Sequence, residues 1–191
     1  IGTADNDDDL TTIGGTATKT FTVFESVTFS GTLHGSIKTS VASGQTLTTT
    51  AAIANGKTID GDGSVAITAL HSTLAANLGA ITAAGGVTAA FAGTDTFTGA
   101  IGNATVNVTA SNTFTTTAAI ASGKTITAAG NGNVAITALH STLAANLSGL
   151  TSASGTVTAA FDDNGTFTGT LGTTTVTVAS SKTLTTTAAI A

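Results

Sequence analysis

A stretch of fourteen residues, VAITALHSTLAANL, occurs twice in this chain, at residues 65–78 and again at residues 134–147. Other segments return at nearly the same spacing, with offsets of 67 to 70 residues between copies. They are TTTAAIA, which begins at Thr48, Thr115 and Thr185, and VTAAF, which ends at Phe91 and Phe161. A fixed internal period of this length indicates a repeat protein, in which each repeat buries its apolar face against its neighbours.

The period divides the chain into four segments. They are an acidic N-terminal segment (1–19), a partial repeat (20–54), a repeat (55–121) and a second repeat (122–191) that ends within its cycle. Ala191 follows directly on TTTAAIA, whereas both earlier copies continue into Gly-Lys-Thr-Ile. We therefore expect either that the sequence is part of a longer polypeptide or that a neighbouring subunit completes the last turn.

Composition and alternation predict an all-β fold. Thr is the most frequent residue, and Gly occupies 23 positions. Thr and Val favour a half-buried sheet surface, and Gly favours turns. Short segments such as KTFTVF at 19–24 and TVNVT at 105–109 alternate apolar and polar residues. Such alternation places the apolar side chains on one face of a strand and Thr on the other.

Two all-β architectures fit this spacing, a repetitive parallel β-solenoid and Thr-rich β-sandwich repeats. We favour the solenoid, because a cycle of about 69 residues divides into roughly three coils of about 23 residues, so that like segments stack on like. Asn55-Gly56 is a hairpin signal and keeps the sandwich as the alternative. Leu70, Leu74, Leu78 and Ile81 also form a helical stripe, so a short helix competes with strands there.

Charge and cysteine content exclude several classes of function. The formal net charge is −5 with only five basic residues, whereas nucleic-acid binders neutralise many phosphates with clustered Lys and Arg. The absence of Cys excludes disulfides and thiolate metal sites. No apolar run reaches the 18 residues of a membrane-spanning helix. We therefore expect neither a nucleic-acid partner nor a transmembrane segment, and the sequence identifies no small-molecule ligand.

Two pairs, His71-Ser72 and His140-Ser141, have the residue types of a nucleophile and its base. Catalysis would need a third group that orients the base, and neither pair has an acidic residue near it in the sequence. Duplication of the repeat explains why both pairs occur. We therefore expect that the chain is not an enzyme and has no catalytic residues.

Aspartates cluster in three places, and carboxylate oxygens at this density suit Ca²⁺, which takes roughly six to eight oxygen ligands. The predicted metal ligands are Asp5, Asp7, Asp8 and Asp9 near the N-terminus, Asp60 and Asp62 in one Gly-rich turn, and Asp162 and Asp163 in another. A solvated terminus explains the first cluster without an ion, and ordinary turn chemistry explains the other two. Calcium is the one cofactor that the sequence suggests.

The segments TLTTTAAIA, GKTI, VAIT, VTAAF, TFTG and TVTVA together resemble the Thr, Ala and Gly-rich β-strand repeats of large exported bacterial surface proteins. These relatives are adhesin-like and surface-layer-like chains that are often associated with type I secretion. The resemblance covers about residues 20–191. It implies an extracellular location on the bacterial cell surface, a role as stalk, coat or lattice element, and calcium as a common ligand of relatives.

These observations predict a structural protein that associates with copies of itself into a filament or lattice. A strand stack with few charges and no Pro is prone to association. The alternative is a binding module, either an adhesin or an ice-binding β-solenoid. Thr-x-Thr pairs suggest an ice-binding face, but they are interrupted by Ala, Gly and Asn and occur on several strands, so outward Thr on ordinary strands explains them better.

Overall fold

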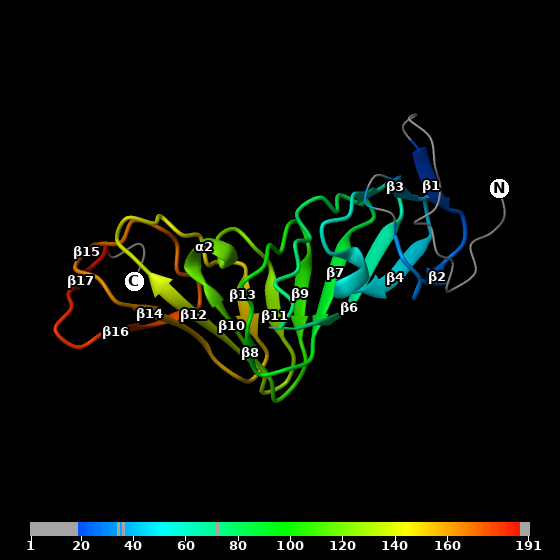
Figure 1. The fold of residues 1–191 in the computed structure, drawn as a ribbon. Coiled ribbons are helices and arrows are strands. Elements are labelled where there is room, and N and C mark those ends of the chain that lie inside the picture. Colours follow the sequence, from blue (N-terminus) through cyan, green and yellow to red (C-terminus); the bar gives the residue numbers. More distant parts are fainter. Residues whose placement is uncertain (1–18, 34, 36, 72, 188–191) are drawn as a thin grey trace. The chain divides into compact units, whose positions relative to one another are not determined.

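The computed structural model describes residues 19–33, 35, 37–71 and 73–187 (Figure 1). The described chain is nearly all parallel β-structure, with about 5% helix, and forms a β-solenoid of about 8 turns. The predicted solenoid is thus confirmed, and the parallel pairing excludes the sandwich alternative. Two compact units are distinguished: Ile1–Leu70, Leu74–Ala90 and Gly99–Ala104 form the first, and His71–Thr73, Phe91–Thr98 and Thr105–Ala191 form the second.

In the first unit, the strands of successive coils pair with one another in two sheets. One sheet has the order β1 (Lys19–Val23), β3 (Ile37–Val41) and β5 (Ile59–Asp60). The other has β2 (Val27–Thr28), β4 (Thr46–Thr50), β6 (Ser64–Leu70) and β7 (Val87–Phe91) as neighbours. Paired residues such as Leu47 and Val65 are one coil apart in the sequence.

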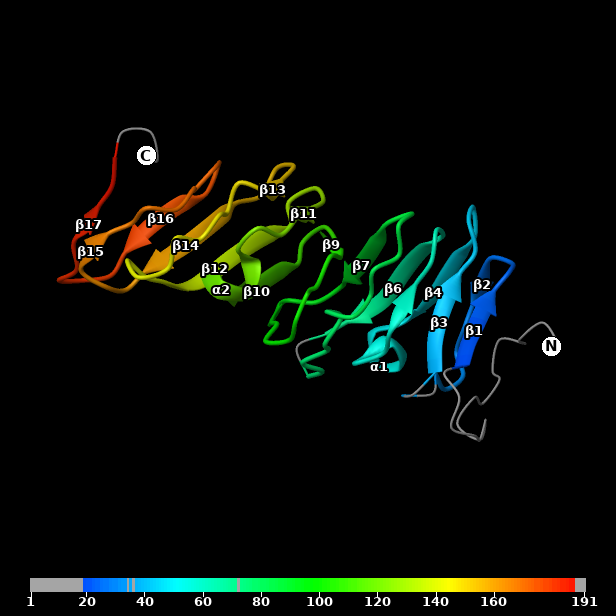
Figure 2. The ribbon, with the colours of Figure 1, turned by 90° about the horizontal axis from the view of Figure 1, so that it is seen from above.

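The second unit follows the same rule (Figure 2). Its longest sheet runs β8 (Asp95–Thr96), β10 (Thr113–Thr117), β12 (Asn133–Leu139), β14 (Val157–Phe161) and β16 (Thr175–Val178). A further set pairs β9 (Thr105–Val108), β11 (Ile126–Ala128) and β13 (Leu150–Ser152), and β15 (Gly165–Thr166) pairs with β17 (Leu184–Thr185). All of these pairs are parallel.

Stacked residues belong to different parts of the repeat, which corrects the expectation that like segments stack on like. The TFTTT strand β10 pairs with the NVAIT part of β12, and β12 pairs with the VTAAF strand β14. The reason is that neighbouring coils lie only about 20 residues apart, whereas the sequence repeats after about 69. Each copy of the sequence repeat therefore forms the same strand pairs. In the first unit β4 pairs with β6, and in the second unit the equivalent strands β10 and β12 pair in the same way.

The inward side chains form an apolar core inside the coils. In β10, Phe114 and Thr116 are buried and the alternate threonines are half-buried. The Phe114 ring meets Phe91 edge to face at 4.8 Å between centroids and Phe97 at 5.8 Å. Removing such a side chain from water stabilises the fold by about 1.5–3 kcal/mol. The alternation of residues along each strand thus places every second side chain inside the coil and the others outside it.

Two helices of one turn each, α1 (Ala51–Ala54) and α2 (Ala118–Ala121), follow the TTT strands. The hydroxyl oxygens of Thr50 and Thr117 cap them by accepting a hydrogen bond from the backbone N–H of the third helical residue, Ile53 and Ile120. Asn55-Gly56, the hairpin signal, instead forms the turn that ends α1. Within the described residues, no helix is long and apolar enough to cross a membrane.

The short helix that the stripe from Leu70 to Ile81 offered as the less favoured alternative does not form in the described residues of this segment. Leu70, Leu78 and Ile81 are fully buried, and Leu74 is half-buried. The backbone N–H of Leu78 donates to Ala100 in the following coil, at 2.9 Å. This backbone N–H thus bonds to a neighbouring coil and not to a carbonyl within a helix. The Thr, Asn and Gly residues of the segment are poor helix formers.

In β4 and β10, a buried threonine bonds to the phenylalanine of the preceding coil. The hydroxyl of Thr116 donates to the Phe97 carbonyl at 2.8 Å, and the Phe97 N–H donates to the Thr115 carbonyl at 2.7 Å. The first unit has the same pair of bonds, with Thr49 donating to Phe29 at 3.0 Å. A buried hydroxyl is tolerated here because it has a partner.

We predict that Thr116→Val lowers the free energy of unfolding by about 1–3 kcal/mol, because the isosteric side chain leaves the buried Phe97 carbonyl without its donor. Chemical denaturation followed by circular dichroism measures the change. Thr115→Val on the outward side of the same strand is the matched control and should change stability by less than about 0.5 kcal/mol. Equal effects of the two substitutions would contradict this account.

Candidate functional site

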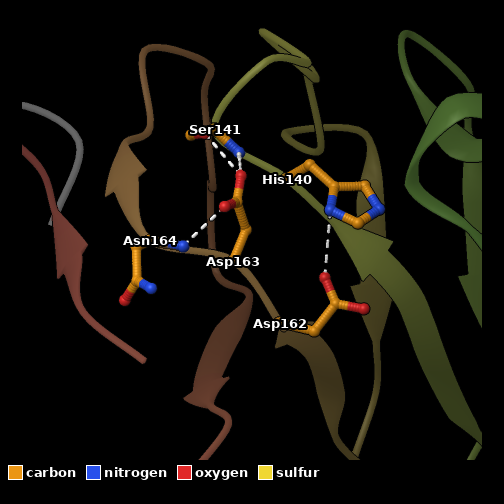
Figure 3. Close-up of polar contacts among 5 residues, drawn as sticks. All are labelled: His140, Ser141, Asp162, Asp163 and Asn164. Carbon is orange, nitrogen blue, oxygen red and sulfur yellow. Dashed lines mark hydrogen bonds and ion pairs between the residues drawn. The ribbon is translucent and has the colours of Figure 1, made fainter. Parts of the chain in front are cut away.

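A cluster of polar and charged side chains lies where two neighbouring coils leave their strands. His140 and Ser141 follow β12, and Asp162, Asp163 and Asn164 follow β14 (Figure 3). The sequence placed these groups in separate motifs 22 residues apart. Parallel pairing of β12 with β14 brings the two chain segments side by side.

A bulge at the end of β12 sets the alignment of the two segments. The register of β12 against β14 shifts between Ile136 and Leu139, and Leu139 then stands opposite Phe161. Ala138, inside the bulge, has a left-handed φ of 52°. Such a conformation is costly for a residue with a side chain and persists where the surroundings determine it. The bulge thus ensures that His140 and Ser141 follow beside Asp162 and Asp163.

The Asp163 carboxylate is held by three donors. Its Oδ2 atom accepts from the hydroxyl of Ser141 at 2.5 Å and from the Ser141 backbone N–H at 3.1 Å. Its Oδ1 atom accepts from the backbone N–H of Asn164 at 2.5 Å. A side chain at position 165 would interfere, because a Cβ there would lie 2.6 Å from the Cβ of Ser141. Gly165 therefore permits the close approach of the two turns.

His140 pairs with the other carboxylate of the same turn. Its Nδ1 atom lies 3.0 Å from Oδ1 of Asp162. The two side chains are 44% and 50% exposed, so solvent screens the pair and its contribution is of the order of 0–1 kcal/mol. Together the His140–Asp162 and Ser141–Asp163 contacts link one coil to the next, and we call these four residues the inter-coil clamp.

Hydrogen bonds to the charged form hold the pKa of Asp163 below its ordinary value of 3.8. The Ser141 hydroxyl has the largest effect, followed by the backbone N–H groups of Ser141 and Asn164. The neighbouring His140 acts in the same direction through its charge. The carboxylate is therefore ionised at neutral pH and acts as an acceptor in the clamp.

The geometry of the clamp is that of a structural link rather than of a nucleophile and its base. A nucleophilic serine would direct its hydroxyl at the imidazole. Here the Ser141 hydroxyl donates to Asp163, while the imidazole of His140 faces Asp162. Figure 3 shows the two interactions side by side, each directed to a different carboxylate.

The first repeat lacks the acidic half of the clamp. Ala92 and Gly93 stand at the positions that correspond to Asp162 and Asp163, although His71 and Ser72 match His140 and Ser141. The side chain of His71 is exposed, and Ser72 lies outside the described residues. The His-Ser motif is thus identical in the two repeats, but the two carboxylates that follow VTAAF occur in the second repeat alone.

The remaining predicted metal ligands do not converge in the part of the chain that the structure describes. Asp60 forms an ion pair with Lys38 at 2.6 Å, and Asp62 lies exposed in the following turn. Over the described residues, no three His or acidic side chains gather where they could hold an ion. Asp5, Asp7, Asp8 and Asp9 lie outside those residues, so calcium binding by that cluster stays a prediction.

Sequence reasoning missed the clamp because it searched for partners near each motif. The signal that would have found it is the coil length, since a residue about 20 positions ahead lies on the adjacent coil. Comparisons with known proteins add no further site, because no family model, no curated protein and no solved structure matches this chain.

We predict that acid weakens the second unit through Asp163. Because its pKa is lowered by folding, its contribution to stability is present above pH 3.8 and is lost as the pH falls through the folded-state pKa. Asp163→Asn should therefore melt at a lower temperature than the parent near pH 7, and the difference should shrink toward about pH 2. Thermal denaturation followed by circular dichroism across this range measures both.

The control for this prediction is Asp62→Asn, which removes an exposed carboxylate from a turn in the first unit. It should leave the melting curves of the parent almost unchanged at every pH. A constant difference between Asp163→Asn and the parent from neutral to acid pH would show that the carboxylate does not titrate in the clamp as described.

Proposed function

We propose that this chain is a structural repeat segment of an extracellular bacterial surface protein, which forms a stalk, coat, lattice or filament by self-association. The observation that carries the proposal is the construction of the coils, in which parallel ladders tie each coil to the next and uncharged threonines cover the strands outside. Such a surface suits a role in which the chain is a building element.

Parallel ladders support a mechanical role. Within each unit, the main-chain hydrogen bonds join one coil to its neighbours, as from Ala42 to Val23 and from Ala129 to Val108, each at 2.9 Å. Separating two coils requires a set of these bonds to break together. Buried threonine hydroxyls and the inter-coil clamp add side-chain links in the same direction.

Self-association is supported by the low content of charged residues and by the absence of Pro. Charged residues are 8% of the chain, against roughly 25% in an ordinary soluble protein, and Pro is absent. Natural sheet proteins use charge and Pro to prevent strands from associating with other chains. We infer that copies of this chain are its principal partners.

The proposal includes a location on the bacterial cell surface and the lack of enzymatic activity, and each of the two rests on a different observation. The bacterial cell surface rests on the resemblance of the repeats to those of exported proteins. The lack of catalysis is supported by the clamp, in which the histidine and the serine bond to different carboxylates.

An ice-binding module is the second candidate, and one observation favours it. The register aligns Thr115, Thr158 and Thr175 on the outside of one sheet, a row of hydroxyl and methyl groups that Ala135 interrupts. Thermal hysteresis of a solution of the chain would support this candidate.

The proposal is tested by sedimentation velocity of the purified chain over a wide concentration range, with electron microscopy of the same samples. We expect the sedimentation coefficient to rise with concentration and ordered sheets or filaments to appear in the images. A chain that remains monomeric at every concentration and in the presence of calcium would overturn the proposal.

A further inference from the structure

The outward side of β10, β12, β14 and β16 is a continuous surface of one chemical kind. We call it the threonine face and define it by its ten outward residues, which are Thr113, Thr115, Thr117, Asn133, Ala135, Thr137, Thr158, Ala160, Thr175 and Thr177. All ten are exposed or half-buried. We infer that a second copy of this chain docks on the threonine face, an inference that rests on the proposed function and identifies the surface it uses.

The rows of the face follow from the strand register. The central row runs from Thr115 through Ala135 and Thr158 to Thr175, one residue from each coil. A flanking row pairs Thr117 with Thr137, and further along the sheet Ala160 pairs with Thr177. Parallel, in-register strands thus place Thr and Ala side chains in rows at the strand spacing of about 4.8 Å.

No charged residue is among the ten. Asp95 lies on β8, the strand next to β10 in the sheet, and the clamp aspartates lie in the turn after β14. An occupant of the face therefore loses no ion hydration when it docks. A strongly charged partner such as nucleic acid would find no complementary charges there.

A second copy is the occupant that this chemistry fits. Strand segments with high β-propensity, low charge and no Pro pack face to face as dry sheets about 10 Å apart. Two identical threonine faces present the same row spacing, so methyl groups of one can lie between those of the other. A contact of this kind uses the same patch on both copies, as a two-fold interface requires.

The two sheets of the first unit differ in the charge of their outward sides. The outward side of its β1, β3 and β5 sheet carries the Lys38–Asp60 ion pair, whose burial would cost the hydration of both charges. The outward side of β4, by contrast, presents Thr46, Thr48 and Thr50 in the same places as the threonines of β10. The strands β4 and β10 therefore each present three uncharged threonines on their outward side.

The test places charge on the face without touching the core. Thr115→Lys/Thr158→Lys introduces two lysines in the central row, two coils apart. Asn107→Lys/Thr151→Lys is the matched control, because these exposed residues stand two coils apart in one row of β9, β11 and β13. Circular dichroism confirms that both variants fold, and sedimentation velocity measures the assembly of each.

We expect the face variant to remain monomeric at concentrations about ten times above those at which the parent and the control variant assemble. Thr115→Glu/Thr158→Glu should also be monomeric alone, and a mixture of the Lys and Glu variants should assemble again, because opposite charges then meet across the interface. Restoration in the mixture is a result that a folding defect would not give.

Three outcomes would overturn the inference. If the parent and the Lys face variant assemble equally, copies associate elsewhere and only the assignment of the face fails. If the parent is monomeric throughout, the proposed self-association fails as well. If the monomeric parent shows thermal hysteresis that the Lys face variant lacks, the occupant of the face is ice and not a second copy.

Discussion

Main-chain hydrogen bonds between neighbouring coils are the constraint on which the rest of this structure depends. They run in one direction through each unit, and they fix which residue of one coil stands beside which residue of the next. Once that register is set, the period of two along each strand determines the inside and the outside. The phenylalanine core, the buried threonine bonds and the outer threonine rows are all consequences of the same register.

Polar groups inside or beside the stack are matched to carbonyls and carboxylates that the ladder has already positioned. Thr49 and Thr116 can be buried because the neighbouring coil presents a carbonyl at each place. Ser141 finds Asp163 for the same reason, with a bulge adjusting the alignment by one step. The side-chain links therefore strengthen a register that the backbone defines, rather than defining it themselves.

The parallel solenoid followed from the sequence because its signals are local and repeated. Alternation in TFTTT and the spacing of the copies are visible without any knowledge of neighbours in space. Relations between coils were harder to see: the pairing of TFTTT with NVAIT, and of His140 with Asp162, joins segments that share no sequence signal. The four-residue helices escaped notice because AAIA is too short to show a helical period, although the preceding threonine is a capping signal.

The mismatch between coil length and repeat length has a consequence for folding. Because residues 65–78 and 134–147 are identical, β4 finds the same Val-Ala-Ile-Thr partner sequence in either repeat, and backbone pairing alone cannot tell the correct partner from its duplicate. Only residues that differ between the repeats remove this ambiguity. Asp162 and Asp163 differ in this way, since the first repeat has Ala92 and Gly93 in their places. Their partners His140 and Ser141 recur in the sequence as His71 and Ser72, however, so the two carboxylates do not by themselves distinguish one repeat from the other. Exact duplication of a strand together with its following turn therefore leaves strand exchange as a competing outcome of folding, which an array of identical repeats invites.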